Sequence, residues 1–223
     1  MNNREILSEN IEIFNDLTIK EQNLLLNLST IKTFEKHQMI KTVDTGCSGL
    51  MFVKTGEIRV YLLSDEGRDI TLYRLHEGEI CIFSSMCVLN QINFDVFIEA
   101  MDDVEILQVG TAAISQLSKT NIKFENFLLN LTIERFNDVM WTMQQILFKS
   151  MDVRVATFLL DESVSRSSDS FKITHEEVAK YLGSAREVVT RTLKYFQTEH
   201  IVKLHRGGIE IIDKNKLKKV ANK

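Results

Sequence analysis

The segment that most constrains the fold, residues 122–147, contains neither glycine nor proline. From Leu129 onward, its apolar residues recur at alternating steps of four and three, and we call these six residues the seam. They are Leu129, Ile133, Phe136, Met140, Met143 and Leu147, preceded one repeat earlier by Ile122. A seven-residue repeat keeps one face of a helix against a partner helix. The segment therefore predicts a long helix that forms a dimer. The alternative is a helix packed only on its own domain, and because Phe127, Leu128, Trp141 and Ile146 lie partly off the seam, we expect contacts of both kinds.

Residues 30–109 follow a different pattern of short alternating runs. Ile58, Val60 and Leu62 alternate with Glu57, Arg59 and Tyr61, which predicts a strand with one buried face. Glycines punctuate these runs, and Asp65-Glu66-Gly67 has the form of a hairpin turn. The region predicts a β-roll that encloses a small cavity. A short helix precedes it, because Thr18-Ile-Lys-Glu21 has the form of a capping box.

Two short helices are predicted near the C-terminus. Thr174-His-Glu-Glu177 and Ser184-Ala-Arg-Glu187 both have the form of a capping box, and Gly183 lies between the two helices. This order is typical of a helix-turn-helix. Residues 201–211, with Arg206-Gly207-Gly208 at their centre, predict a hairpin behind it, and hence a winged helix-turn-helix.

Composition and charge narrow the class of protein. The 223 residues are 44% hydrophobic and 26% charged, as in a globular protein. Apolar runs are too short to span a bilayer and the first residues do not resemble a secretion signal, so we expect a cytoplasmic protein. Residues 151–223 carry 14 Lys and Arg against 10 Asp and Glu, whereas residues 1–150 carry 13 against 21. A basic C-terminal part favours a polyanionic partner, although solvated surface charge would give the same balance.

The order of these parts resembles the Crp/Fnr family of bacterial transcription regulators over essentially the whole chain. The most specific match is the recognition sequence Arg-Glu-x-x-x-Arg, here Arg186, Glu187 and Arg191. The resemblance implies an α+β fold with three parts. These are a cyclic-nucleotide-binding-like β-roll with its N-terminal helix (1–119), a dimerisation helix (120–150) and a winged helix-turn-helix (151–223). It also implies a homodimer on double-stranded, two-fold-symmetric DNA, with RNA polymerase as a further candidate partner.

Several residues of the second helix and one of the wing have expected roles. Arg186 is expected to read guanine, because a guanidinium pairs bidentately with N7 and O6. Glu187 would accept from cytosine N4 or belong only to the capping box, and Arg191 would hold Glu187 or contact a base or phosphate. The expected phosphate contacts come from Ser184, Thr190 and Arg206.

The effector is expected to differ from cyclic AMP. Relatives that bind cyclic AMP hold its phosphate with an arginine, but residues 80–95 of this chain contain none. This stretch instead contains Cys81, Cys87 and Phe94, with His76 just upstream. Haem, a thiol redox switch, an unknown small molecule and cysteines that only pack all remain open, so the cofactor is unknown.

Catalytic motifs are absent from the sequence. His175-Glu176 begins like a zincin helix, but Ala179 stands where the second histidine is required. We therefore expect an effector-responsive regulator and no enzyme. The alternative is a small thiol or haem redox protein with a vestigial DNA-binding domain.

Overall fold

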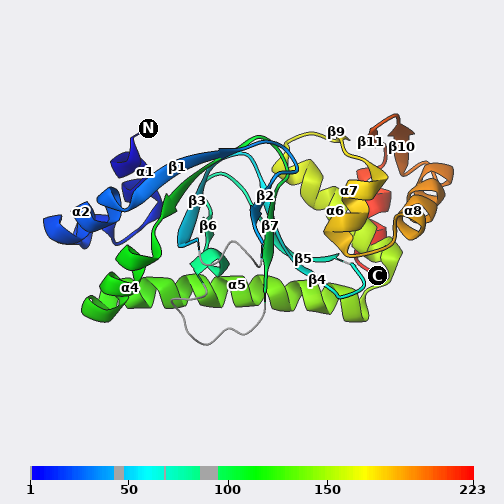
Figure 1. Cartoon of the computed structure of the whole chain (residues 1–223). Helices are drawn as coiled ribbons and strands as arrows, with labels where there is room; N and C mark the ends of the chain where they lie inside the picture. The colour runs from blue at the N-terminus through cyan, green and yellow to red at the C-terminus, as the bar shows by residue number, and fades with distance from the viewer. Residues whose placement is uncertain (1, 43–47, 68, 86–94) are drawn as a thin grey trace. The chain divides into compact units, whose positions relative to one another are not determined.

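The computed structural model describes residues 2–42, 48–67, 69–85 and 95–223. Two compact units divide the chain, one made of residues up to 63 together with 72–140, and the other of 64–71 together with 141–223. Both contain helices and antiparallel strands, which confirms the predicted α+β fold (Figure 1). None of the helices in the described ranges combines the length and apolar character that crossing a membrane requires.

The first unit begins and ends with helices. Thr18 starts α2 with the predicted capping box, since its backbone N–H donates to Glu21 Oε2 at 2.8 Å and its hydroxyl accepts from the backbone N–H of Glu21. The helical elements are α1 (Asn3–Asn10), η1 (Phe14–Asp16), α2 (Ile19–Asn27), η3 (Phe83–Ser85), α4 (Thr111–Thr120) and α5 (Ile122–Phe148), of which the residues after 140 belong to the second unit.

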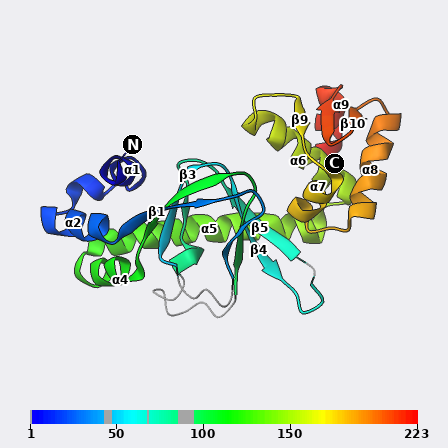
Figure 2. The same cartoon turned by 45° about the horizontal axis from the view of Figure 1, so that its top comes forward.

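Two four-stranded sheets form the β-roll between these helices (Figure 2). The first has the order β1 (Ser29–Phe34), β8 (Val104–Val109), β3 (Leu50–Thr55), β6 (Ile80–Cys81). The second has the order β2 (Met39–Lys41), β7 (Phe97–Ala100), β4 (Ile58–Leu63), β5 (Asp69–Leu75). Residues of both sheets, such as Phe52 and Val60, join one buried hydrophobic cluster, which confirms the predicted roll.

The strand β4 departs from the predicted alternation. Arg59 is fully buried and Glu57 and Tyr61 nearly so, although all three were expected on an exposed face. The guanidinium of Arg59 lies 3.4 Å from a carboxylate oxygen of Glu99 on β7 and 4.3 Å from the centroid of the Tyr61 ring. Because its charge is paired and its planar group lies over an aromatic ring, Arg59 tolerates burial. The strand is therefore covered on both faces.

The long helix α5 has one buried and one exposed apolar face. Phe124, Leu128 and Leu131 pack into the hydrophobic cluster of the roll. The six seam residues are instead between 40% and 64% exposed in the single chain. The helix therefore presents an apolar stripe that its own roll leaves uncovered.

The second unit packs helices against a small sheet. Val178, Leu193 and Phe196 are among the residues of its separate core. The sheet has the order β10 (Val202–His205), β11 (Gly208–Ile211), β9 (Ser170–Lys172). The helices are α6 (Met151–Ser165), α7 (His175–Leu182), α8 (Arg186–Thr198) and α9 (Lys214–Ala221).

Candidate nucleic-acid interface

Helices α7 and α8 form the predicted helix-turn-helix. At the start of α7, the Thr174 hydroxyl accepts from the Glu177 backbone N–H at 3.1 Å, and the Thr174 backbone N–H donates to the Glu177 carboxylate at 2.7 Å. At its end, Gly183 has φ 55° and ψ 44°, a left-handed conformation that favours glycine. A capped start and a glycine stop fix the length of α7 and thereby the place where α8 begins.

Helix α8 begins one residue later than its predicted capping box requires. The position of the N-cap is taken by Ala185, which makes no side-chain cap. Ser184 still belongs to the turn, because its backbone N–H donates to the carbonyl of Ala179 at 3.0 Å. The capping box at Ser184 and Glu187 is therefore wrong. The carboxylate of Glu187 has no capping role and stays free for another contact.

The exposed face of α8 gathers most of the predicted DNA-binding residues. A surface hollow of about 480 Å³ is lined by Arg186, Glu187, Thr190, Arg191 and Lys194. Three cations and one carboxylate give this hollow a net positive charge, which suits a phosphate backbone. Lys194 was not predicted, although its distance of four residues from Thr190 and eight from Arg186 places all three on one stripe. Within the described chain, no ion pair joins Arg191 to Glu187, so its expected role of holding Glu187 gains no support.

Two residues of α7 contact this stripe. A carboxylate oxygen of Glu176 lies 3.8 Å from the Nε of Arg186. The Nδ1 of His175 lies 3.1 Å from the hydroxyl oxygen of Thr190. Burial and then the charges of Arg186 and Lys194 lower the pKa of His175. Neither contact was predicted, because spacing in the sequence does not show which α7 side chains face α8.

The wing places Arg206 at the tip of a hairpin. Strands β10 and β11 pair in antiparallel register, with His205 opposite Gly208. Gly207 makes the turn with φ 74°, and Arg206 is exposed. An exposed cation on a tight turn is suited to reach a phosphate that flanks the site read by a helix.

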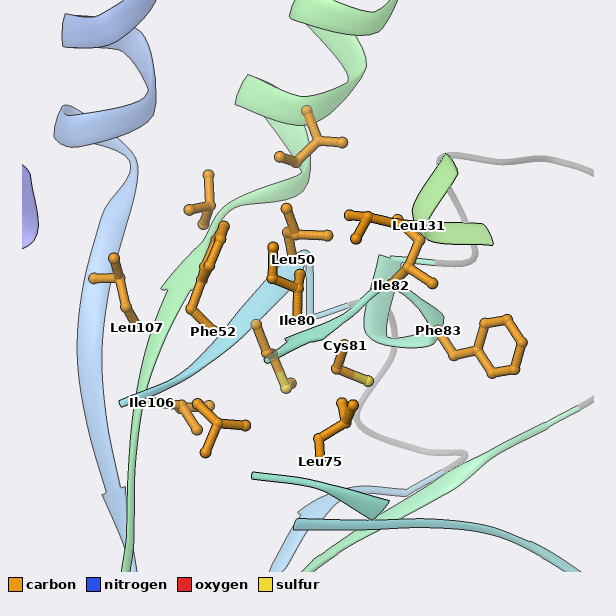
Figure 3. Packing of buried hydrophobic residues seen from close by; sticks show 14 of the residues in the cluster. Leu50, Phe52, Leu75, Ile80, Cys81, Ile82, Phe83, Ile106, Leu107 and Leu131 are labelled. Carbon is orange, nitrogen blue, oxygen red and sulfur yellow. The ribbon is translucent and has the colours of Figure 1, made fainter. Parts of the chain in front are cut away.

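The predicted effector residues are described only in part, since Cys87 and Phe94 lie outside the described residues. Cys81 is fully buried, and Figure 3 shows its side chain among Leu75, Ile80 and Ile82. Its Sγ lies 4.0 Å from the hydroxyl of Tyr73. Burial raises the pKa of the Cys81 thiol, so the protonated, weakly reactive form is favoured.

His76 lies at the surface. Its side chain is 42% exposed, and its Nδ1 lies 3.6 Å from a carboxylate oxygen of Glu57. Among the described residues, its partner is therefore an acidic residue of the roll. In the part of the chain that the structure describes, no three His, Cys, Asp or Glu side chains are grouped to hold a metal ion.

A winged helix-turn-helix that follows a β-roll and a long helix defines a class of DNA-binding regulators. Residues 153–220 match the family model of the Crp-like helix-turn-helix domain, and residues 31–121 match that of the cyclic nucleotide-binding domain. A solved structure of a Crp/Fnr-family protein from Eubacterium rectale ATCC 33656 is 40% identical, with a TM-score of 0.90. The match covers 95% of this chain and 98% of that chain. The chain belongs to the Crp/Fnr family of DNA-binding transcription regulators.

Curated relatives are more distant but also span most of the chain. The cyclic AMP receptor protein of Thermus thermophilus is 24% identical over 94% of this chain and 96% of its own length. The global nitrogen regulator of Nostoc sp. PCC 7120 is 22% identical over 81% of this chain and 84% of its own length. The predicted family is thus confirmed, and none of these matches supports the alternative of a thiol or haem redox protein.

Proposed function

We propose that this chain is a homodimer that binds a two-fold-symmetric DNA site and responds to an effector other than cyclic AMP. The observation that carries the DNA-binding part is the exposed face of α8. Arg186, Thr190 and Lys194 form one stripe there, with Glu187 and Arg191 beside it around a single hollow. A helix with this mixture of donors, acceptor and positive charge is suited to enter a major groove.

Base reading is assigned to Arg186 and Glu187. Arg186 is the first residue of α8, and its side chain is 64% exposed. Its guanidinium fits the N7 and O6 acceptors of guanine. Glu187 makes no capping hydrogen bond, which leaves its carboxylate to accept from cytosine N4. These two neighbours would read adjacent base pairs of one half-site.

The remaining interface residues are assigned to the backbone. Ser184, Thr190, Arg191 and Arg206 carry hydroxyl or guanidinium donors, which hydrogen-bond to phosphate oxygens without regard to sequence. Lys194 joins this group because it extends the same stripe of α8. Such contacts set the affinity and its dependence on salt, whereas the base contacts set the specificity.

Dimerisation is assigned to the seam of α5. Its six apolar residues are exposed in one chain while the opposite face packs on the roll. A second copy of the same helix would cover them with the same repeat. The two copies of α8 in such a symmetric dimer would contact half-sites about one helical turn of DNA apart. The three-part division at residues 119 and 150 remains part of this proposal, with the dimerisation helix as a part of its own.

The proposal of an effector other than cyclic AMP rests on charge. Residues 80–95 lack an arginine, and a buried phosphate without a cation costs several kcal/mol. The haem and thiol alternatives are weakened by Cys81, whose raised pKa and apolar surroundings favour a packing role. The effector is therefore sought among small molecules that fit the roll.

A gel shift against fragments of the host genome tests the proposal. The wild-type protein should retard a small subset of fragments, and Arg186→Ala should retard a larger subset, because one base position of each half-site is no longer read. Adding cyclic AMP should leave the shift unchanged, and a shift that depends on cyclic AMP would contradict the effector part.

Contact with RNA polymerase remains a prediction, and supershift of the same complexes by polymerase tests it.

A further inference from the structure

The contact between His175 and Thr190 joins α7 and α8, the two helices of the helix-turn-helix. His175 is the first residue of α7, and its partly buried ring faces α8. Its Nδ1 lies 3.1 Å from the hydroxyl oxygen of Thr190. On α8, Thr190 is flanked one turn away on either side by Arg186 and Lys194, which line the same hollow. A titratable group therefore contacts the centre of the proposed DNA-binding stripe.

We assign the neutral His175 ring the tautomer that carries its proton on Nε2, and in that tautomer the protonation of His175 decides what Thr190 offers to DNA. A neutral imidazole with its proton on Nε2 accepts at Nδ1, so the threonine hydroxyl donates to the ring and presents only lone pairs outward. An imidazolium donates from Nδ1 instead. The hydroxyl oxygen then accepts this bond, and its own proton is released to donate to a phosphate oxygen or a base acceptor.

The charges around His175 set its protonation. Arg186 and Lys194 face it from α8, while Glu176 and Glu177 follow it on α7. Glu176 lies beside Arg186, and Glu177 is engaged in the Thr174 cap. Burial and the two cations lower the pKa of His175 in the free protein. Phosphates approaching the same stripe would offset both cations and favour the imidazolium.

We propose that His175 is a positioning residue that takes up a proton from solvent when DNA binds and so turns the Thr190 hydroxyl toward the DNA. This inference rests on the proposed function and adds a regulatory property to the same site. Because the complex binds more protons than the free protein, its affinity rises as the pH falls. The rise is at most about tenfold per pH unit for each subunit, between the pKa values of His175 in the free and bound protein. At lower and higher pH the contribution is constant.

Proton uptake by the full-length dimer tests the inference. The probe is a duplex that the wild-type protein has selected from random DNA. Titration calorimetry in two buffers of different protonation enthalpy counts the protons, and fluorescence anisotropy at constant ionic strength gives the dissociation constant from about pH 6 to about pH 8. Wild-type protein should take up protons and bind more tightly at about pH 6.

Three variants separate the roles. His175→Gln keeps a polar side chain that does not titrate, and it should abolish the uptake. His200→Asn, at an exposed site beyond the end of α8, should retain the wild-type uptake. Thr190→Val should weaken binding more at about pH 6 than at about pH 8, because only the protonated state frees its hydroxyl. Thermal melting establishes that each variant is folded.

The outcomes distinguish two failures. Equal proton uptake by wild type and His175→Gln, no uptake by wild type, or an equal loss of affinity in Thr190→Val at both pH values would overturn the inference. Binding of selected DNA in those experiments would leave the proposed function intact. A wild-type protein that selects no DNA sequence would overturn the proposed function and this inference together.

Discussion

The Nε of Arg186 lies 3.8 Å from a carboxylate oxygen of Glu176, which links the first residue of α8 to the second residue of α7. Both side chains are more than half exposed, at 64% and 58%. An exposed pair of this kind contributes only about 0–1 kcal/mol, so a guanine edge can displace it. The pair also places a negative charge beside the proposed path of the phosphate backbone.

Glu176→Gln should therefore tighten binding to all DNA sequences together. The repulsion between the Glu176 carboxylate and the phosphates is worth up to about 1 kcal/mol. Its removal corresponds to about a fivefold lower dissociation constant. Anisotropy titrations with selected and scrambled duplexes measure the change. Glu199→Gln, at the exposed far end of α8, is the matched control and should leave the affinity nearly unchanged. A gain confined to one sequence would contradict the expected electrostatic cause.

Arg186→Ala should relax specificity at one base position of each half-site. Loss of a bidentate arginine contact costs about 1–3 kcal/mol of discrimination. Titration of duplexes that carry each single-base replacement measures this loss. Arg206→Ala should instead weaken binding to all of these duplexes by a similar factor, because the wing is expected to contact only the backbone. Unchanged preference at every position in Arg186→Ala would remove this residue from base reading.

The helix-turn-helix was largely predictable from the sequence, because the signals that start and end its helices lie within a few residues of each other. A threonine with a glutamate three residues later fixes the start of α7, and Gly183 fixes its end. Both ends can therefore be predicted without knowing the tertiary structure. The same pattern failed at Ser184, where closure of the preceding turn uses the backbone of that residue. The contact of His175 with Thr190 depends on how two helices cross, and one sequence does not contain that angle.

Asp at a seam position should separate the dimer. Phe136→Asp would bring two carboxylates together across apolar surface, and an uncompensated buried charge costs several kcal/mol. Sedimentation should show monomers, and binding to a duplex that contains both half-sites should be lost. Phe148→Asp is the matched control, because Phe148 is 79% exposed on the same helix but outside the seam. Intact dimers of the Phe136→Asp protein would rule out the seam as the interface.

Stability should fall at alkaline pH. Burial raises the pKa of both Cys81 and Tyr73 in the folded state. Their contribution is therefore complete below the unfolded-state thiol pKa, about 8.5, and is lost as the pH rises through the folded values. Each group removes up to about 1.4 kcal/mol per pH unit in its window. Denaturation midpoints under reducing conditions from about pH 7 to about pH 10 measure the slope.

Cys81→Ala tests the thiol part of this slope. It should flatten the loss that begins near pH 8.5, while the loss from Tyr73 begins only near its ordinary pKa of about 10. An unchanged slope in the variant would show that folding does not raise the pKa of the Cys81 thiol. The same protein should respond to effectors as wild type does if Cys81 only packs, and loss of the response would restore the sensor hypothesis.

The burial of charged residues in the roll was not predictable from the alternation of strands. Arg59 and Tyr61 occupy positions that alternate with Ile58 and Val60, as an exposed face would. The burial of Arg59 depends on Glu99, which lies forty residues further along the chain and pairs with Arg59 across neighbouring strands. The alternation within one strand does not reveal a partner so distant in the sequence. The pair can be recognised only once the register between the strands is known.

Selection of binding sites from random DNA by the wild-type protein tests the central claim most directly. A dimer that reads DNA through α8 should enrich an inverted repeat, with half-site centres about 10 base pairs or a multiple apart. Each half-site should contain a guanine that is no longer required by the Arg186→Ala protein. Enrichment of a single asymmetric motif, or of no motif, would contradict a homodimer that reads symmetric DNA.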